Sequence, residues 1–184
     1  MFRNLFLVLV PGADPADRVV HADALSETTI VPVPSGPAAV SVVSSFGEVH
    51  LIELYGGLGL DTAAAVSRPG VPVGFPGLAM PPVAAAVLFE DPVAARWTFG
   101  ATTVATVPSV TAAPEVAVSL VAAGAERVEL CGGMGPLIAA EVAAAVDVPV
   151  TTVLFGVESL PSAVAYRTRF AAALSQMSSQ SPNG

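Results

Sequence analysis

The sequence contains no lysine, only one cysteine and two histidines, and no long hydrophobic run. Without lysine there can be no Schiff-base or lysine-nucleophile mechanism, and no phosphate-binding lysine of a P-loop. The single Cys131 cannot form an internal disulfide, so a reducing cytoplasm fits this chain. His21 and His50 stand in no His-x-x-x-His or Glu-x-x-His pattern, so we expect no metal site. No segment approaches the roughly 20 apolar residues of a membrane span.

Charged residues are also scarce. They make up 12% of the chain against 53% hydrophobic residues, a composition typical of a folded domain and not of a disordered chain. The formal net charge of −8 leaves no electrostatic footprint for nucleic acid or anionic lipid, so we expect neither as a partner. The 184 residues are enough for one medium domain or two small ones that share a core.

An internal repeat is the strongest feature that is present. The stretch "IELYGGLGLDTAAAV" at 52–66 returns as "VELCGGMGPLIAAEV" at 128–142. With one residue of slip, the same spacing pairs Asp14-Pro15 with Asp91-Pro92. A repeat of this length decides the fold class, because each copy should form the same set of elements. We therefore predict that the chain consists of two tandem copies of one unit.

Apolar runs and helical patterns alternate within each copy. The predicted strands are Leu5–Val10, Thr28–Val33, Val49–Tyr55, Val71–Phe75, Ala84–Phe89, Thr102–Val107, Arg127–Cys131 and Pro149–Phe155. The predicted helices are Pro37–Phe46, Leu60–Ser67, Pro114–Ala123, Pro136–Val146 and Pro161–Leu174, with a short helix or loop opened by Asp14-Pro15. Short apolar strands between helices indicate a mostly parallel sheet with helices covering its faces.

The predicted fold class is therefore α/β, with two pseudo-symmetric β-α repeats. The first repeat spans residues 1–80 and the second spans 81–160. Each is marginal alone, so the two should pack into one compact unit with a ligand cleft between them. Residues 161–184 are predicted to form a C-terminal helix and a flexible tail. The sequence leaves a homo-oligomer open.

The two glycine turns are candidate binding elements. They contain Gly56, Gly57 and Gly59 in the first copy and Gly132, Gly133 and Gly135, with Met134 among them, in the second. Both turns end a strand and open a helix, where ligands of parallel sheets bind and free N–H groups could hold an oxyanion. The alternative is that these glycines serve only close packing. The spacing GGxG differs from the dinucleotide fingerprint GxGxxG, so we expect no cofactor.

Two carboxylates are the leading catalytic candidates. Glu53 and Glu129 each stand two residues before the first glycine, inside an otherwise apolar strand. Burial would raise the pKa of each carboxyl toward values suited to acid–base catalysis. The alternative is structural: the carboxylates could hold backbone N–H groups or an arginine across the pseudo-twofold. Cys131 is either a thiolate nucleophile or a small core residue, and Tyr55 either donates to a substrate oxygen or caps the core.

Four further side chains are weaker candidates. His21 follows the first predicted strand, and we place it near the same sheet edge as the glycine turn, as an acid–base candidate. Arg18 and Arg96 follow the Asp-Pro turns and could grip an anionic group or pair with nearby carboxylates. Trp97 could form an apolar wall of a substrate site, although ordinary core packing is the favoured interpretation.

The repeat resembles a family of short bacterial and archaeal proteins of unknown function. Those proteins carry a Pro-Gly-Ala-Asp-Pro stretch, a Glu-Leu-Cys-Gly-Gly-Phe-Gly-Pro phrase and a Val-Pro-Val-Gly strand. The first copy keeps "PGADP" at 11–15 and "VPVG" at 71–74 but has Tyr55 in place of the cysteine. The second copy keeps "ELCGG" at 129–133 and lacks the Pro-Gly-Ala part before Asp91. The resemblance implies a fused version of a unit that normally stands alone.

A second, narrower resemblance covers six residues. The stretch "GGMGPL" at 132–137 is similar to the glycine turn of aspartate and glutamate racemases, which are two-domain α/β enzymes with a cysteine pair. This chain has one cysteine and carries the stretch in the middle of the repeat. The resemblance implies at most a single-cysteine variant of that chemistry.

The function expected from the sequence is that of a cofactor-independent cyclase, isomerase or lyase of secondary metabolism. Its substrate would be a small, mostly apolar or weakly anionic organic molecule held in the cleft between the repeats. Glu129 would act as acid or base, and Glu53 and Tyr55 would orient the substrate. The alternative is a non-catalytic small-molecule-binding or assembly protein, in which both carboxylates are buried in hydrogen bonds.

Overall fold

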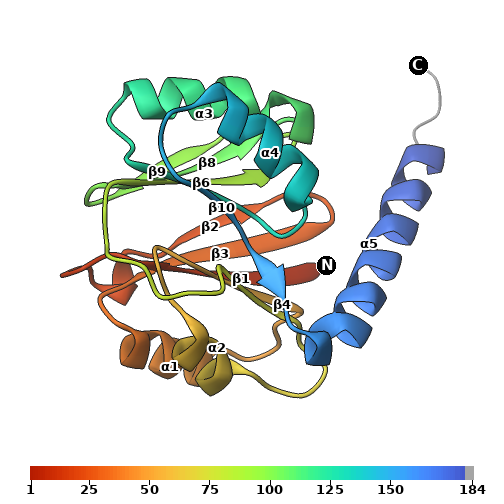
Figure 1. Cartoon of the computed structure of the whole chain (residues 1–184). Helices are drawn as coiled ribbons and strands as arrows, with labels where there is room; N and C mark the ends of the chain where they lie inside the picture. The colour runs from red at the N-terminus through yellow and green to blue at the C-terminus, as the bar shows by residue number, and fades with distance from the viewer. Residues whose placement is uncertain (181–184) are drawn as a thin grey trace.

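The chain folds into two α/β halves stacked in four layers (Figure 1). The computed structural model describes the backbone of residues 1–180 and the side chains of residues 1–173. A six-stranded and a five-stranded sheet lie face to face in the middle, and two helices cover the outer face of each sheet. The predicted α/β class with mostly parallel sheets in two halves is confirmed.

The first half supplies most of the six-stranded sheet. Its elements are β1 (Phe2–Leu9), the 3-10 turn η1 (Pro15–Asp17), β2 (Val19–Ala22), β3 (Ser26–Val33), α1 (Gly36–Ser45), β4 (Leu51–Tyr55), α2 (Leu60–Val66) and β5 (Val73–Phe75). The strand order is β11-β5-β4-β1-β3-β2. Only β2 and the late strand β11 (Leu154–Phe155) run antiparallel to their neighbours.

The second half repeats this arrangement. Its elements are β6 (Ala85–Glu90), β7 (Arg96–Phe99), β8 (Thr102–Val107), η2 (Val110–Ala112), α3 (Ala113–Ala122), β9 (Arg127–Leu130), α4 (Gly135–Ala145) and β10 (Val150–Thr152). The strand order β10-β9-β6-β8-β7 matches β5-β4-β1-β3-β2 element by element. A proline in the first turn opens both α3 and α4, as the sequence indicated.

The layer arrangement differs in one respect from the expected sheet with helices on its faces. Along β1, Leu5 and Leu7 pack in a core with α1 and α2, whereas Phe6 and Val8 belong to the core shared with the second sheet. The rings of Phe6 and Phe89, one from each sheet, lie 5.3 Å apart. The inner face of each sheet is therefore covered by the other sheet, and apolar side chains make up most of the contact between the halves.

The two halves differ after their central strands. Val10 and Asp91 occupy equivalent positions, since the N–H of each donates over 2.9 Å to the carbonyl of Val33 or Val107 at the end of the neighbouring strand. Asp14 lies further along a longer loop in the first half. The predicted pairing of Asp14 with Asp91 is therefore wrong, because the structural register places Val10 opposite Asp91.

The edges of the sheets also depart from the prediction. The short antiparallel strands β2 and β7 were not predicted, and the expected strand Pro149–Phe155 divides into β10 and β11 around Val153. Val153 is 3% exposed, and its N–H donates to the carbonyl of Leu130. The chain thus crosses from one sheet to the other between β10 and β11.

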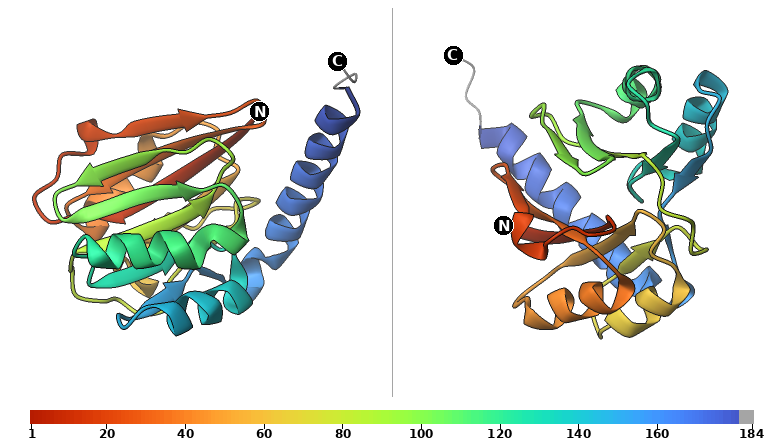
Figure 2. Two further views of the ribbon diagram at one scale, coloured as in Figure 1. Left: turned by 90° about the horizontal axis from the view of Figure 1, so that it is seen from above. Right: turned by 90° about the vertical axis from the view of Figure 1, so that its left-hand side faces the viewer.

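The C-terminal helix α5 (Leu160–Gln180), which follows the 3-10 turn η3 (Val157–Ser159), lies along one side of the stacked sheets (Figure 2). The Tyr166 hydroxyl donates to Asn4 Oδ1 over 3.0 Å, and Phe2 packs against both Tyr166 and Phe170. The helix continues into 175–180, which the sequence assigned to the flexible tail; the rest of that tail, 181–184, lies outside the described residues. Among residues 1–180 no helix has the length and apolar character of a membrane span.

Candidate functional site

The two sequence-predicted carboxylates meet the opposite glycine turns in a reciprocal pair of hydrogen bonds. Glu53 and Glu129 point into the core between the sheets and are 2% and 1% exposed. The N–H of Gly132 donates to Glu53 Oε1 over 3.1 Å, and the N–H of Gly56 donates to Glu129 Oε2 over 2.8 Å. Each carboxylate therefore fixes the glycine turn of the other half, which is the structural alternative that the sequence left open.

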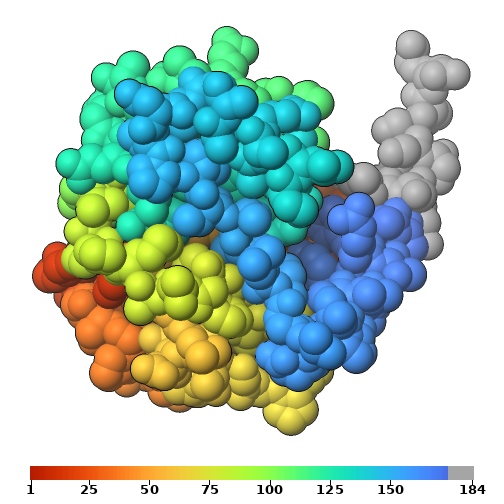
Figure 3. Space-filling view, in the orientation of Figure 1, coloured from red at the N-terminus to blue at the C-terminus, as the bar shows by residue number. Residues whose placement is uncertain are grey.

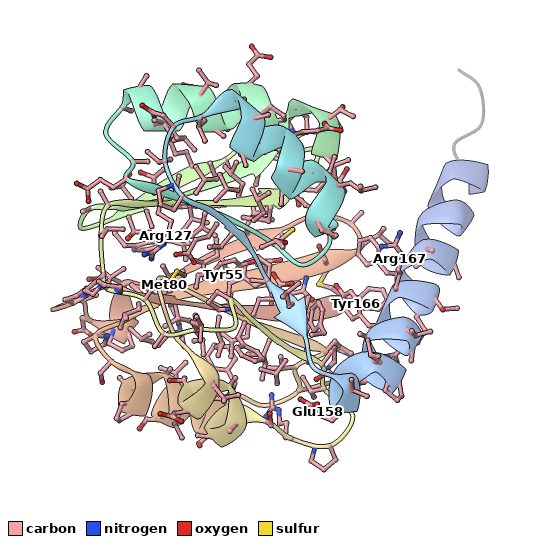
Figure 4. The ribbon with its side chains drawn as sticks, viewed as in Figure 1. Tyr55, Met80, Arg127, Glu158, Tyr166 and Arg167 are labelled. Carbon is pink, nitrogen blue, oxygen red and sulfur yellow. The ribbon has the colours of Figure 1, made fainter. Side chains whose placement is uncertain are left out.

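The negative charge of Glu129 is balanced by an arginine on the same strand. Arg127 Nε donates to Glu129 Oε1 over 2.7 Å, and Arg127 Nη2 lies 2.6 Å from the same oxygen. Arg127 Nη1 also donates to the carbonyl of Pro81 over 3.0 Å, so the guanidinium ties β9 to the segment between the halves. Arg127, Tyr55 and Met80 lie in the middle of the molecule between the two layers of helices (Figure 4). The arginine at this position was not among the residues we singled out.

Glu53 has no such arginine. It accepts a short hydrogen bond from the Tyr55 hydroxyl, and Tyr55 is fully buried. Burial raises the pKa of the Glu53 carboxyl from 4.5 to about 7, because desolvation outweighs the hydrogen bonds from Tyr55 and Gly132. Burial, with the neighbouring Glu53 charge, likewise holds the pKa of Tyr55 well above its ordinary value. The pair can therefore keep a proton inside the core at neutral pH.

Cys131 lies beside this pair and is 8% exposed. Burial, followed by the charge of Glu53, raises the pKa of the Cys131 thiol to about 12. A thiol with so high a pKa stays protonated at neutral pH, and a protonated thiol is a poor nucleophile. The geometry thus favours the core-residue interpretation of Cys131. Met134 is also a core side chain, at 5% exposure.

The segment between the two halves packs directly against the first glycine turn and leaves no space there for a ligand. A Cβ on Gly57 would lie 2.3 Å from the carbonyl oxygen of Met80, and one on Gly59 would lie 2.6 Å from the amide nitrogen of Ala79. The corresponding Gly133 of the second turn is exposed, and its nearest neighbour would be Cys131 Sγ at 3.7 Å. The close approach that Gly57 permits is therefore to the chain itself.

This difference gives a matched pair of substitutions. We expect Gly57→Ala to lower the free energy of unfolding by about 2 kcal/mol or more, because its φ of +95° is unfavourable for alanine and the new methyl would overlap Met80. We expect Gly133→Ala to change it by less than about 0.5 kcal/mol. Urea unfolding at one pH measures both values. Equal effects of the two substitutions would contradict this account of the turns.

His21 lies away from the glycine turn of its own half. It belongs to β2 and pairs with Thr28 near the amino end of β3, whereas the turn follows the carboxyl end of β4, so the predicted shared edge is wrong. His21 Nε2 lies 3.1 Å from Asp91 Oδ1 of the other half, and both side chains are less than 10% exposed. The ring of Trp97 lies 5.2 Å from the His21 ring. The His21–Asp91 contact therefore joins the two halves.

A cavity of about 450 Å³ opens between the halves at the end of β1. It is lined by Val10, Pro11, Gly12, Ala13, Asp17, Val19 and Pro32 from the first half and by Trp97, Thr98, Phe99 and Gly100 from the second. Neither Glu53 nor Glu129 borders it. Of the predicted site residues only Trp97 borders it, and the rings of His21 and Phe89 lie 5.2 Å and 6.3 Å from the Trp97 ring.

The two candidate arginines do not line this cavity. Arg18 is exposed, and its guanidinium lies 5.9 Å from the centre of the Phe46 ring. Arg96 is exposed at the start of β7. The residues that sequence reasoning missed are the loop Pro11–Ala13 and the hairpin residues Thr98–Gly100. A Pro-Gly turn directly after a buried strand is the signal that could have identified the loop.

Part of the chain matches a known protein family. Residues 90–168, which run from the end of β6 into α5, match the family of unknown function DUF6506. A search of curated proteins found no match to the chain. Within residues 1–180, no three His, Cys, Asp or Glu side chains come together as potential metal ligands.

Proposed function

We propose that this protein binds a small, largely apolar molecule, without catalysis, in the cavity between its two halves. The observation that carries this proposal is the cavity itself, because both halves contribute to its walls and its volume of about 450 Å³ is that of a small-molecule site. A cleft between two related halves is also where the repeat led us to expect a ligand.

The lining defines the chemistry of the ligand. Val10, Val19, Trp97 and Phe99 supply apolar and aromatic surface. Asp17 is the only charged side chain in the lining. A carboxylate repels an anion and attracts a cation or a hydrogen-bond donor, so the ligand is neutral or cationic and not weakly anionic. No pair of acid and base groups faces the cavity, which favours binding over catalysis.

Trp97 provides the test, because it is the only tryptophan of the chain and it lines the cavity. Its fluorescence should change on titration with a ligand from a library of neutral and cationic aromatic compounds. Ala13→Phe should fill the cavity and weaken binding at least tenfold, since Ala13 lines it. Ala16→Phe, at an exposed position in the same loop between β1 and β2 that is not part of the lining, should leave binding unchanged. Binding that both substitutions weaken equally, or that neither weakens, would contradict the site.

One observation favours the enzyme expected from the sequence as a second candidate. The pKa of Glu53 is raised to about 7, near the value that suits a general acid or base at neutral pH. A cyclase, isomerase or lyase would then need the halves to separate locally, because Glu53 is 2% exposed. Compounds that bind should be incubated with the protein and with Glu53→Gln, and the products analysed by mass spectrometry. Turnover that Glu53→Gln abolishes would favour the enzyme.

We also infer that the two halves descend from one duplicated unit. The matching strand orders and the reciprocal Glu–Gly hydrogen bonds support this. The match at 90–168 falls almost wholly on the second half and its C-terminal extension.

A further inference from the structure

A second hollow lies on the outer face of the second half, away from the proposed ligand cavity. Its volume is about 500 Å³, and it lies between the carboxyl-terminal parts of α3 and α4. Val118, Val121 and Ala122 from α3 face Ala144–Val146 across it. Val118 is 46% exposed. The floor and walls of this α3–α4 groove are therefore apolar and open to solvent.

The rim of the α3–α4 groove is acidic. Asp147 lines it directly. Glu115 lies one turn before Val118 on α3, and Glu141 lies one turn before Ala144 on α4. Each carboxylate is exposed and is on the same helix face as the groove residue that follows it. Neither α3 nor α4 contains a basic residue. An apolar groove with an acidic rim suits a helix that presents apolar side chains together with a positive charge.

The C-terminal helix α5 has this character. It contains Arg167 and Arg169 and no acidic residue, in a chain with a net charge of −8. Leu160 and Val164 are 48% and 63% exposed, and Arg167 is also exposed. These three residues are spaced by four and three, so they form one stripe of the helix. The stripe is separate from the side on which Tyr166 packs against Phe2.

This stripe cannot reach the α3–α4 groove of its own molecule, because the Tyr166–Asn4 hydrogen bond holds α5 against the N-terminal end of β1. Figure 3 shows α5 at the side of the molecule. The Tyr166 side chain lies between α5 and the sheets (Figure 4). An α3–α4 groove that meets this stripe therefore has to belong to another molecule.

We propose that the Leu160–Val164–Arg167 stripe of α5 binds the α3–α4 groove of a second copy of this chain. Leu160 and Val164 contact the apolar walls around Val118, and Arg167 meets the acidic rim at Asp147. Two such contacts related by a twofold axis give a closed dimer. This proposal is independent of the ligand cavity.

Light scattering and sedimentation of the full chain from micromolar to millimolar concentration test it. We expect a dimer whose dissociation constant rises with salt, because the contact includes opposite charges. Arg167→Glu should raise the dissociation constant at least tenfold, since it places a carboxylate against the acidic rim. Combining it with Asp147→Arg should restore association. The control is Arg169→Glu, which changes the same charge at a position about half a turn away from the stripe and should have little effect.

Val118→Asp is the second variant, because it changes the groove without touching α5. It should weaken association as Arg167→Glu does, while circular dichroism confirms that both variants are folded. A monomer at every concentration would overturn the proposal. So would a dimer that Arg167→Glu and Arg169→Glu weaken equally, or one that Val118→Asp leaves intact.

Discussion

The buried Glu53 carboxyl should make the free energy of unfolding depend on pH between pH 4.5 and 8. Replacing Glu53 with glutamine should remove most of this dependence. In the folded protein the pKa of Glu53 is about 7, against an ordinary value of 4.5. The contribution of Glu53 to stability is therefore fully present below pH 4.5 and is lost as the pH rises through 7, because the unfolded chain releases the proton first. The shift corresponds to about 3 kcal/mol.

Glutamine suits the test because it keeps both hydrogen-bonding positions. Its carbonyl can accept from Gly132, and its amide can donate to the Tyr55 oxygen, so a bond to each partner remains possible, with the direction of the Tyr55 bond reversed. The variant should be at least as stable as the wild type at pH 8, where the wild type carries a buried charge. Because glutamine does not titrate, residue 53 of the variant should add no stability when the pH is lowered.

Urea unfolding at pH 4.5, 6, 7 and 8 measures the effect as a difference between wild type and variant, which cancels the titration of other groups. Glu48→Gln is the matched control, because the Glu48 side chain is 68% exposed and should give a profile parallel to the wild type. If Glu53→Gln also ran parallel to the wild type, the buried proton on Glu53 would be excluded.

A catalytic and a structural role of Glu53 could not be separated from the sequence, because a raised carboxyl pKa is compatible with both. A glutamate in an apolar strand indicates a perturbed carboxyl, and Glu53 is one. The sequence does not tell whether the carboxyl faces a cavity or a backbone N–H. Here the partner, Gly132, lies in the other half of the chain. The two residues are far apart in the sequence, and only the packing of the two sheets brings them together.

The central strands could be predicted because they are runs of apolar and β-branched residues, such as Thr102–Val107, whose observed bounds match the prediction. The edge strands β2 and β7 are four residues long and half exposed, so they carry neither a long run nor a clean alternation. The layer order could not be predicted either. A strand buried on both faces has the same sequence whether a helix or a second sheet covers it.

The residues that line the cavity could not be identified for a related reason. The cavity depends on the longer loop after Val10, where the second half has Asp91 followed by a shorter connection. A difference in loop length between two copies is visible in an alignment only when the register of the strands is known. The match of Asp14-Pro15 to Asp91-Pro92 concealed it.

Removal of Arg127 should be the most destabilising of the substitutions considered. Arg127→Met keeps most of the length of the side chain and removes the positive charge next to Glu129. Glu129 is 1% exposed, so its carboxylate would remain buried without its ionic partner. Breaking a buried ion pair from one side typically costs about 3–5 kcal/mol. The lost bond to the Pro81 carbonyl adds to this cost, because it also holds the segment between the halves.

A double-mutant cycle separates the charge effect from the loss of packing. Glu129→Gln in the Arg127→Met background removes the unpaired charge and keeps an acceptor for the Gly56 N–H, so the double variant should recover part of the stability lost by Arg127→Met. Arg3→Met is the matched control, because Arg3 pairs with Glu48 at the surface, where both side chains are more than half exposed. We expect it to cost less than about 1 kcal/mol. An Arg127→Met variant no less stable than Arg3→Met would mean that the reciprocal contacts of the glycine turns, and not the ion pair, hold the two halves together.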